Sequence, residues 1–581
     1  MRKVYVFIAL IVAFAMPLEA QWVSPGTGND YTFTELVSAA DGAVIAEDAG
    51  TFRMVADITI SANDGLAIAP DEMTIFMADQ VTLTIQGSFN CRAHDTYVEM
   101  KTENSEHYNL RFENASECNL TGIKFKYGGG FQVIESDVVF EDCYFVHANS
   151  QVTNAAVNFM NCNPTFKNCT FKNNDGAAIS SPVNGNGSPT IIGCYFYNND
   201  ITNANVPQIN LGPGAETTIR IEDCIIEGNG HEMSGGISVA DLVGAGNTSV
   251  LLKGNVIKNN RYGYNQQGYN INAVIEDNQI IDNNLEPDPM NGGSGISIYG
   301  MNTNNIAKLR RNVISGNLWG ITTIYYNDVD LGTEEDPGCN AIFGNHNDAY
   351  GADAEYAIYV NAFSDIPAIG NYWGGNDEDF AESVIYHRPD LGDTYGVVTY
   401  SPIAELHPDI LNLAVTAEAN PQLSQDYFGE IDAENHIVNV FIPEAELTSM
   451  WLYAEIELPL GASSDFVPGE AINLAEPVAV IVETPHGETQ EWTIILSSDW
   501  NVEEATAEAA KIYSNANCQI IVELSCENAE AEVFNVLGQK VGSASLNQGQ
   551  NIIEASGWRN GIYTIVVVQG ANAEVGKVIV R

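Results

Sequence analysis

The sequence predicts an all-β protein in which a solenoid of short parallel strands is followed by two small β-sandwiches. A pattern of cysteine, asparagine and large apolar residues recurs at intervals of 23 to 34 residues from Cys143 to Asn312. Longer alternating strands fill residues 410–500, and short ones separated by glycine fill residues 511–581. A repeat of this length indicates a solenoid, and alternation of apolar and polar residues indicates half-buried strands.

Each repeat has one anchor position that is occupied by cysteine or asparagine. A large apolar residue follows the anchor by two positions, and an asparagine follows it by five positions in nearly every repeat. The anchors are Cys143, Cys169, Cys194, Cys224, Asn255, Asn278, Asn312 and Asn371, and the later asparagines include Asn174, Asn199, Asn229, Asn260, Asn283 and Asn317. Because neighbouring coils of a solenoid stack in parallel, both sets are predicted to form ladders of equivalent side chains.

The cysteines of the anchor ladder are predicted to be reduced and structural. The chain has ten cysteines and no Cys-x-x-Cys pair that would indicate zinc. The anchor position is cysteine in some repeats and asparagine in others, and it lies beside bulky residues such as Phe171. Cysteine is expected to act there as a small hydrophobe. A disulfide between coils is the alternative, but side chains in a parallel ladder point the same way.

Two stretches outside the repeats resemble the ends of a known solenoid. The segment "GTGNDYTFTELVSAADGAVIAEDAGTF" (26–52) is similar to the N-terminal cap, and "GNYWGGND" (370–377) to the closing coil, of pectate-lyase-like proteins. This resemblance implies a right-handed parallel β-helix over residues 21–405. The same fold carries lyases, hydrolases, adhesins and structural proteins, so it does not define an activity.

The N-terminus has the features of a signal peptide, predicted to span residues 1–20. Arg2 and Lys3 precede an apolar run from Val4 to Met16, and Ala20 offers a small residue for cleavage. No other segment approaches transmembrane length, so no transmembrane anchor is expected.

Residues 410–500 resemble the immunoglobulin-like modules on surface proteins of the Bacteroidetes. The segments "HIVNVFIP" (436–443) and "PVAVIVETP" (477–485) alternate as strands that end at proline. Trp451, Tyr453 and Trp492 are predicted to lie in the core of this sandwich, because aromatic residues dominate small β cores. A platform on which sugars stack is the alternative role for these three rings.

The C-terminal residues 511–581 resemble the sorting domain of the type IX (Por) secretion system. The resemblance rests on "AEVFNVLGQKVGSASLNQG" (531–549), "NGIYTIVVV" (560–568) and "GKVIVR" (576–581). The matching residues are Phe534, Asn535, Leu537, Gly538, Gln539, Gly561, Tyr563 and Lys577. The resemblance implies that the type IX secretion machinery is a partner and that the protein is secreted or attached to the outer cell surface.

The charge of the chain argues against some partners. It has 23 lysines and arginines against 76 acidic residues, which gives a formal net charge of −53. Nucleic acid is not expected as a partner, because its binding depends on cationic contacts to phosphate. Anionic polysaccharides would also be repelled unless a divalent cation intervened.

Candidate chemistry is sparse. No Asp-Asp pair is present, and Gly230-His231 is followed by Glu232, so the motifs of polygalacturonase-type hydrolases are missing. For a lyase, which needs calcium and a base, the candidate bases are Arg261 and Arg388. The candidate calcium ligands lie in a predicted loop at 326–338 and are Asp328, Asp330, Glu334, Glu335 and Asp336. Calcium is expected to bind weakly there, if at all, and to stabilise the loop. The alternative is an acidic loop that is solvated and binds no ion.

Three functions follow from these features. The favoured one is a secreted or surface β-helix protein that binds glycans or other partners without turnover. The first alternative is a polysaccharide lyase or glycoside hydrolase that acts on a polymer lying along the coils. The second alternative is a structural or adhesive rod.

Overall fold

The structure is a computed structural model in which two compact units divide between Glu405 and Leu406. It describes residues 21–68, 73–93, 97–103, 106–244, 246–351, 353–497, 510–515, 519–524, 529–535, 539–555, 558, 561–569 and 572–580. The predicted signal peptide, residues 1–20, lies outside the described residues.

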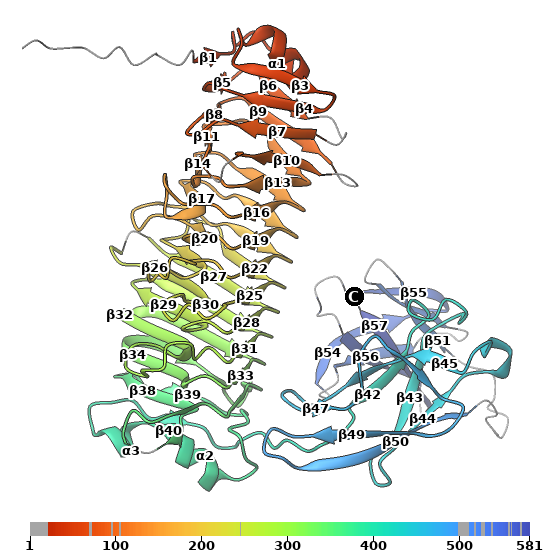
Figure 1. Ribbon diagram of the computed structural model, residues 1–581. Helices are drawn as coiled ribbons and strands as arrows, with labels where there is room; N and C mark the ends of the chain where they lie inside the picture. Colours follow the sequence, from red (N-terminus) through yellow and green to blue (C-terminus); the bar gives the residue numbers. More distant parts are fainter. Residues whose placement is uncertain are drawn as a thin grey trace, which may run out of the picture. The chain divides into compact units, whose positions relative to one another are not determined.

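The first unit is a parallel β-helix with three faces, here called the first, second and third face in chain order (Figure 1). The first face contains β1 (Trp22–Val23), β5 (Ile58–Ile60), β8 (Thr82–Ile85), β11 (Asn109–Glu113), β14 (Phe131–Ile134), β17 (Ala155–Met160), β20 (Ala177–Ser180), β23 (Ile209–Leu211), β26 (Ile237–Asp241), β29 (Tyr264–Gly268), the starts of β32 (Ser294–Arg310) and β34 (Trp319–Asp330), β38 (Ile358–Ala362) and β40 (Ile385–Tyr386).

The second face continues each coil after a bend. It contains β2 (Asp30–Tyr31), β6 (Gly65–Ile68), β9 (Ser88–Arg92), β12 (Cys118–Thr121), β15 (Val138–Glu141), β18 (Thr165–Lys167), β21 (Thr190–Ile192), β24 (Ile219–Glu222), β27 (Thr248–Lys253), β30 (Ile271–Glu276) and the ends of β32 and β34. β39 (Ile366–Pro367) and β41 (Val398–Thr399) form a parallel pair. The expected loop at 326–338 is therefore wrong for residues 326–330, which belong to β34.

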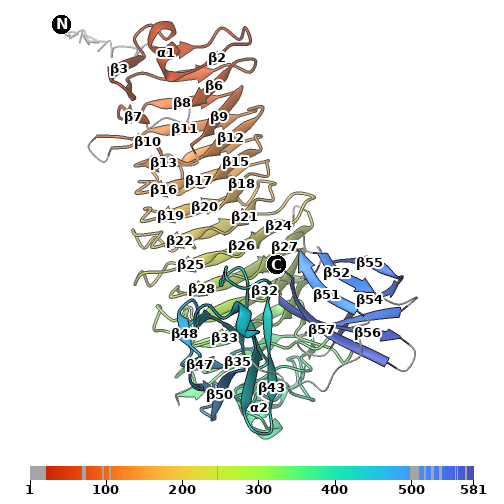
Figure 2. The same ribbon diagram turned by 90° about the vertical axis from the view of Figure 1, so that its right-hand side faces the viewer.

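The third face is a separate sheet of 13 strands. It contains β3 (Val44–Asp48), β4 (Thr51–Met54), β7 (Met73–Met77), β10 (Val98–Lys101), β13 (Ile123–Lys126), β16 (Tyr144–Val146), β19 (Thr170–Lys172), β22 (Tyr195–Tyr197), β25 (Ile225–Glu227), β28 (Val256–Lys258), β31 (Gln279–Ile281), β33 (Val313–Ser315) and β35 (Ala341–Phe343). Figure 2 shows the successive strands of this unit stacked in parallel.

Helices close the two ends of the β-helix. At the N-terminal end lies α1 (Phe33–Ala39), which begins with a capping box between Thr32 and Glu35. At the other end lie α2 (Glu378–Val384), which buries Ala381 and Val384, and α3 (Arg388–Leu391). These helices lie next to the terminal coils, where open strand edges would otherwise invite pairing with other chains.

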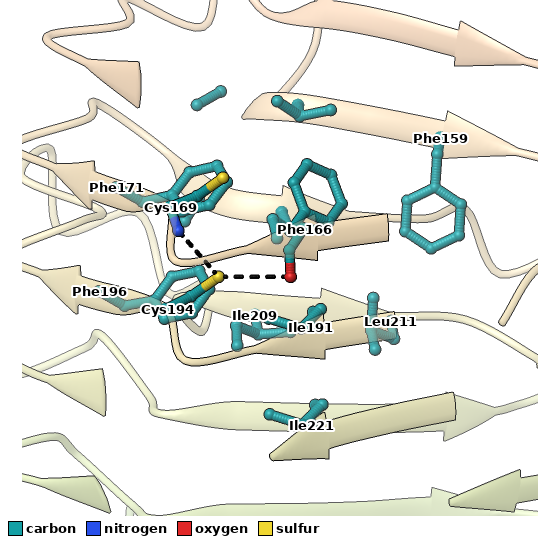
Figure 3. Packing of buried hydrophobic residues seen from close by; sticks show 14 of the residues in the cluster. Phe159, Phe166, Cys169, Phe171, Ile191, Cys194, Phe196, Ile209, Leu211 and Ile221 are labelled. Atoms are coloured by element: carbon teal, nitrogen blue, oxygen red, sulfur yellow. Dashed lines mark hydrogen bonds between the residues drawn. The ribbon is translucent and has the colours of Figure 1, made fainter. Parts of the chain in front are cut away.

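The interior of the coils is a stack of equivalent side chains in strict register. Phe145 pairs with Phe171 and Phe171 with Phe196 along the third face. Their ring centroids lie 4.6 and 4.9 Å apart, with the ring planes 5° from parallel. Figure 3 shows Phe171 and Phe196 of this stack. This spacing is close to the ~4.8 Å between neighbouring strands, so the rings stack because the coils do.

The cysteine anchors form one buried column, in which the thiols take part in hydrogen bonds. Cys143, Cys169, Cys194 and Cys224 are at most 1% exposed, and none forms a disulfide. The N–H of Cys169 donates to the sulfur of Cys194 over 3.3 Å, and that thiol donates to the carbonyl oxygen of Phe166 over 3.6 Å (Figure 3). The cysteines therefore act as weak polar groups as well as small hydrophobes.

Asparagine continues the same column with the same bonds. The N–H of Cys224 donates to Oδ1 of Asn255, and Nδ2 of Asn255 donates to the carbonyl of Ile221 over 2.8 Å. The pattern continues through Asn278, Asn312, Asn340 and Asn371. Sequence analysis missed Asn340, which lies between the two most widely separated anchors.

Three of the four cysteine anchors precede a phenylalanine of the inner stack. The first three cysteine anchors are followed two positions later by Phe145, Phe171 and Phe196. Asn255, Asn278 and Asn312 are instead followed by isoleucine. Cys224 is followed by Ile226, however, and Asn371 by the buried Trp373, so side-chain volume alone does not decide between cysteine and asparagine.

The second column is built from buried asparagine amides, but one expected member is absent. Nδ2 of Asn174 donates to Oδ1 of Asn199 over 2.7 Å, and the equivalent bonds run from Asn260 through Asn283 and Asn317 to Asn345. Asn229 was predicted to join this column and that prediction is wrong, because its side chain is exposed.

Gln208 fills the gap that Asn229 leaves. Its Oε1 accepts from Asn199 over 2.8 Å, and its Nε2 donates to Oδ1 of Asn260 over 2.9 Å. The register places Gln208 level with Gly236, Gly263 and Gly295 on later coils. A Cβ on Gly295 would lie 2.8 Å from Nδ2 of Asn317, so glycine is needed where the asparagine is present.

The first part of the second unit is a β domain of about ninety residues, whose immunoglobulin-like assignment stays a prediction. A seven-stranded sheet contains β42 (Asn412–Val415), β43 (Tyr427–Asp432), β44 (Ile437–Phe441), β46 (Glu455–Glu457), β47 (Ser463–Ser464), β49 (Val478–Glu483) and β50 (Thr489–Ser497). β45 (Trp451–Tyr453) pairs with β48 (Ala471–Asn473), and η1 (Glu444–Glu446) lies between β44 and β45.

The three aromatic residues of this domain have different roles. Trp492 is fully buried and donates to the carbonyl of Pro408 over 2.9 Å, as expected for a core residue. Trp451 and Tyr453 are 60% and 44% exposed, so their predicted core positions are wrong. β45 instead turns Leu452 toward the core, and the alternation of the strand leaves both aromatic side chains outside.

The C-terminal residues form two antiparallel sheets over one shared core, as predicted for the sorting domain. One sheet contains β51 (Ala510–Asn515), β52 (Gln519–Leu524) and β55 (Gly549–Glu554), and the other β53 (Ala529–Phe534), β54 (Lys540–Leu546), β56 (Gly561–Gln569) and β57 (Asn572–Val580).

The residues that carry the resemblance to sorting domains lie mainly at one hairpin and in the core. The N–H of Asn535 donates to the carbonyl of Gln539, and the N–H of Gln539 donates to Oδ1 of Asn535, which closes the connection after Phe534. Tyr563 is buried, and burial lowers the pKa of Lys577. Leu537 and Gly538 lie outside the described residues, and Gly561 begins β56.

Replacing Gln208 with leucine should destabilise the β-helix. The side-chain amide of Asn199 and Oδ1 of Asn260 would lose their partner, and each buried group left unpaired costs roughly 1–3 kcal/mol. Asn229→Ala is the matched control and should change stability by less than about 0.5 kcal/mol, because Asn229 is exposed. Calorimetry of the mature chain measures the change in unfolding free energy for each substitution. Equal changes for the two substitutions would contradict this account of the column.

Replacing Cys169 with alanine should also cost stability, by roughly 1–3 kcal/mol, through a small cavity and unpaired carbonyl groups. Burial raises the pKa of the Cys169 thiol, so it should react with thiol reagents only after unfolding. Thermal denaturation of the variant measures the loss of stability. Mass spectrometry of the alkylated, unsubstituted protein measures the reactivity of the thiol. A disulfide among Cys143, Cys169, Cys194 and Cys224 would disprove the reduced column.

Candidate functional site

The acidic residues proposed as calcium ligands are paired with cations of the chain. Arg310 is almost completely buried, and its Nη2 lies 2.8 Å from Asp330 and 2.9 Å from Asp336. Lys308 lies 2.7 Å from Asp336. Burial raises the pKa of Asp336, but hydrogen bonds from Arg310 and Lys308 outweigh it and hold that pKa below its ordinary value. Repulsion between these carboxylates is therefore relieved without a metal ion.

The remaining acidic candidates are exposed. Asp328 projects from β34, and Glu334 and Glu335 lie on the turn that follows it. Within the described residues, no cluster of three or more histidine, cysteine, aspartate or glutamate side chains is arranged to hold a metal ion. The calcium expectation therefore gains no support from the geometry.

The two candidate bases are each engaged in holding loops. Arg261 donates through Nε to the carbonyl of Asn291 over 3.0 Å and through Nη1 to the side chain of Asn205. Arg388 donates to the carbonyl of Tyr395 over 2.6 Å and to Asp365 over 2.8 Å. Both guanidinium groups connect segments distant in sequence, which gives each arginine a structural role that sequence analysis had not assigned.

The first face carries a different feature, a column of outward side chains that we call the uncharged strip. Its members bear amide or hydroxyl groups and come from eight successive coils. They are Gln132, Asn158, Ser180, Asn210, Ser238, Asn265, Ser297 and Thr322. On the first-face parts of these strands in the described chain, the outward positions hold no charged residue, and the carboxylate of Asp241 at the end of β26 is buried.

The strip is partly ordered by bonds between its own members. Asn158 donates to the hydroxyl of Ser180 over 2.8 Å, and Asn265 donates to that of Ser238 over 3.0 Å. Each amide keeps further donor and acceptor capacity, because it has two N–H groups and two lone pairs. Five members are half-buried, and Ser180, Ser238 and Thr322 are buried, so none of the eight side chains is fully exposed.

Aromatic residues continue the column beyond Thr322. The register places Tyr359 next to Thr322 and Tyr386 next to Tyr359. Tyr350 belongs to the hairpin formed by β36 (His346–Asn347) and β37 (Ala354–Glu355), and its ring lies 5.9 Å from that of Tyr359 at 22°. Tyr350 is 56% exposed, so the cluster presents an aromatic side chain to solvent.

The rest of this aromatic cluster is rigidly packed. The indole of Trp319 donates to the carbonyl of Pro289 over 2.8 Å, and its ring lies 4.8 Å from that of Tyr356. The hydroxyl of Tyr350 donates to that of Tyr359. Burial and the neighbouring hydroxyl raise the pKa of Tyr359, so its hydroxyl stays protonated at neutral pH. The strip and the cluster together form the candidate site.

Two carboxyl groups lie on the turns that precede the first face. Burial raises the pKa of Asp175, beside His147, and that of Asp200, beside His231. Asp200 accepts hydrogen bonds from the backbone of Ala204 at 2.9 Å, so it orders its own loop. Sequence analysis did not single out these carboxyls, because nothing in their local pattern distinguishes them.

Comparison with known proteins follows the two regions of the chain. Residues 160–333 match the family model of the right handed beta helix region, and residues 511–581 match that of the secretion system C-terminal sorting domain. No curated protein matches. In the part of the chain that the structure describes, no helix is long and apolar enough to span a membrane.

Solved structures are similar only at a distance. A mutant of the periplasmic alginate epimerase AlgG is 10% identical, with 64% of this chain and 83% of that chain covered and a TM-score of 0.41. AlgG itself is 13% identical, with 65% and 84% covered and a TM-score of 0.35. The Siphovirus 9NA tailspike receptor binding domain is 10% identical, with 89% and 98% covered and a TM-score of 0.22. Similarity at this level assigns no activity to this chain.

The tail defines where the protein acts. A secretion system C-terminal sorting domain indicates export by the type IX system and attachment at the cell surface. The protein is thus an exported right-handed β-helix protein that ends in a type IX secretion sorting domain.

Proposed function

We propose that this protein binds an uncharged polysaccharide along the first face of its β-helix, at or outside the cell surface, without cleaving it. The observation that carries the proposal is the uncharged strip. The chain has a net charge of −53, yet the outward positions of these first-face strands bear amides, hydroxyls and apolar groups instead of charges. A surface that only had to be soluble would show the acidic character of the rest of the chain.

The chemistry of the strip suits a neutral sugar polymer. Amide and hydroxyl groups donate to and accept from sugar hydroxyls, and no charge is needed. Successive members lie ~4.8 Å apart along the axis, which is close to the length of one pyranose unit in an extended polysaccharide. At the end of the strip, the rings of Tyr350 and Tyr359 offer the apolar faces on which sugar rings stack.

Binding without turnover is supported by how the candidate catalytic groups are used. Arg261 and Arg388 are engaged with loop carbonyls and side chains. Asp330 and Asp336 are engaged with Arg310. A hydrolase would need one carboxylic acid and one carboxylate across the scissile bond. Asp175 and Asp200 are two carboxyls with raised pKa beside the first face, so the test below includes hydrolysis as an outcome.

Replacing Asn210 and Asn265 together with leucine should weaken binding of a neutral polysaccharide such as glucomannan about tenfold or more. Each lost hydrogen bond is worth roughly 0.5–1.5 kcal/mol, and about 1.4 kcal/mol is a factor of ten. The matched control is Asn272→Leu, which changes an exposed asparagine of β30 on the second face. Affinity electrophoresis or calorimetry measures the change, and binding should be nearly independent of salt because no charges take part.

The outcomes of this experiment separate the three functions. Equal binding by the double variant and the control would remove the strip as the site. Release of reducing ends, or of unsaturated products that absorb ultraviolet light, would establish the hydrolase or lyase alternative. Absence of binding to every neutral polysaccharide would favour the structural or adhesive rod.

Deleting residues 511–581 should stop delivery to the cell surface and leave the β-helix folded. The sorting domain has its own hydrophobic core and belongs to a different compact unit from the β-helix. Surface labelling of cells reports delivery, and the thermal transition of the truncated protein reports folding. Surface exposure of the truncated protein would contradict the role of the tail.

A further inference from the structure

The third face carries a local surface whose charge is opposite to that of the whole chain. We call it the lysine–tyrosine surface, and it consists of the outward side chains of β10, β13, β16, β19 and β22. They are Glu99, Lys101, Lys124, Lys126, Tyr144, Val146, Thr170, Lys172, Tyr195 and Tyr197. Four lysines against one glutamate give this patch a formal charge of +3, within a chain of −53.

Two of the four lysines lie close to the single carboxylate of the patch. Lys101 and Lys126 each approach Glu99 to 2.6 Å, one at each carboxylate oxygen. One negative charge is thus shared by two ammonium groups, which leaves a positive excess even where the patch is ion-paired. Both cations also hold the glutamate in place between neighbouring strands.

The other two lysines lie over tyrosine rings. The ammonium of Lys124 lies 3.8 Å from the ring centroid of Tyr97, and that of Lys172 lies 5.0 Å from the ring centroid of Tyr197. Among the described residues, no carboxylate lies within ion-pair distance of either. A ring face positions an ammonium group without neutralising it, so both charges stay available to a ligand.

Tyrosine rings supply the other half of a binding surface. The rings of Tyr195 and Tyr197 lie 6.0 Å apart at 20°, and the ring of Tyr144 meets that of Tyr97 edge on at 5.5 Å. Tyr97 is 41% exposed. Each ring combines an apolar face with a hydroxyl at its tip, the combination that suits a sugar ring with its apolar face and polar rim.

The surface has a defined end. From β25 onward the equivalent outward positions change to Ile225 and Glu227, then to Val256 and Lys258. Lysine and tyrosine are therefore concentrated on five adjacent coils rather than spread along the face.

We propose that the lysine–tyrosine surface binds an anionic saccharide, with Lys124 and Lys172 at its carboxylate or sulfate groups and the tyrosines against its rings. Charge complementarity selects the anion, and the tyrosine rings favour a sugar over an acidic peptide. The acidic remainder of the chain acts over a Debye length of about 8 Å and disfavours long, densely charged polymers such as nucleic acid. This site is separate from the uncharged strip, so the protein can hold two different glycans at once.

The experiment uses the mature chain and two probes, short oligogalacturonate and a chondroitin sulfate oligosaccharide. Lys124→Met with Lys172→Met removes both charges and keeps the side-chain stems. The matched control is Lys253→Met on the second face, where the lysine pairs with Glu276 at 3.0 Å. Binding of at least one probe should weaken about tenfold or more in the double variant and stay unchanged in the control.

Added salt should weaken this binding, unlike that of a neutral polysaccharide. Lys124→Arg with Lys172→Arg should keep it, which separates a role of charge from one of packing, and the thermal transition verifies folding. Failure of both probes to bind, or equal binding by the double methionine variant, would overturn the proposal. So would loss of probe binding in the Asn210→Leu, Asn265→Leu variant, because the anion would then occupy the first face. Sedimentation shows whether the lysines instead hold a second copy of the chain, and self-association that the methionine variant abolishes, without probe binding, would also overturn it.

Discussion

The hydrogen bond from an inward polar side chain to the next coil is the interaction on which this structure depends. A β-helix turns sharply between its faces, and each turn leaves backbone groups that no strand can satisfy. At the turn before the third face, Asn255 accepts from the N–H of Cys224 and donates to the carbonyl of Ile221. Repeated on the coils from Cys169 to Asn371, this bond fixes both the position of the turn and the register of the next strand.

Backbone geometry at the turn makes this bond possible. The residue before each anchor is in the left-handed conformation, as in Asn168 before Cys169 and Asp223 before Cys224. Asparagine, aspartate and glycine adopt that conformation most readily, which accounts for their abundance at these turns. Strict register inside the coils then has a consequence outside them, because outward side chains are also aligned in columns. The uncharged strip and the lysine–tyrosine surface both exist because the inner ladders hold neighbouring coils in the same register.

The ladders could be predicted from sequence because anchor, apolar residue and asparagine lie within a few residues of one another. Their offsets survive any change in loop length elsewhere in the coil. The prediction failed at Asn229, where the chain leaves the column and Gln208, the residue just before β23, takes its place. The geometry gives the proposed calcium ligands no support, because Arg310 pairs with Asp330 across neighbouring coils, and the local sequence pattern does not show such a pair. Trp451 and Tyr453 were misplaced because alternation shows that one side of a strand is buried but not which side.

The members of the uncharged strip share a local sequence pattern that the sequence analysis did not use. Each member follows an inward apolar residue directly, as in Ile179-Ser180, Ile209-Asn210 and Ile296-Ser297. Loops of very different length separate these pairs from the anchors, so no fixed offset connects them. Only the structure aligns the pairs on one face, and the same holds for the lysines of the third face.

Hydrogen exchange of the mature protein with and without a bound neutral polysaccharide tests the central claim most directly. The account predicts added protection in peptides that contain the first-face strands β17 to β34 and the segment around Tyr350. Peptides from the third face should exchange at unchanged rates. Protection confined to the second or third face, or to the second compact unit, would contradict the assignment of the first face as the binding surface.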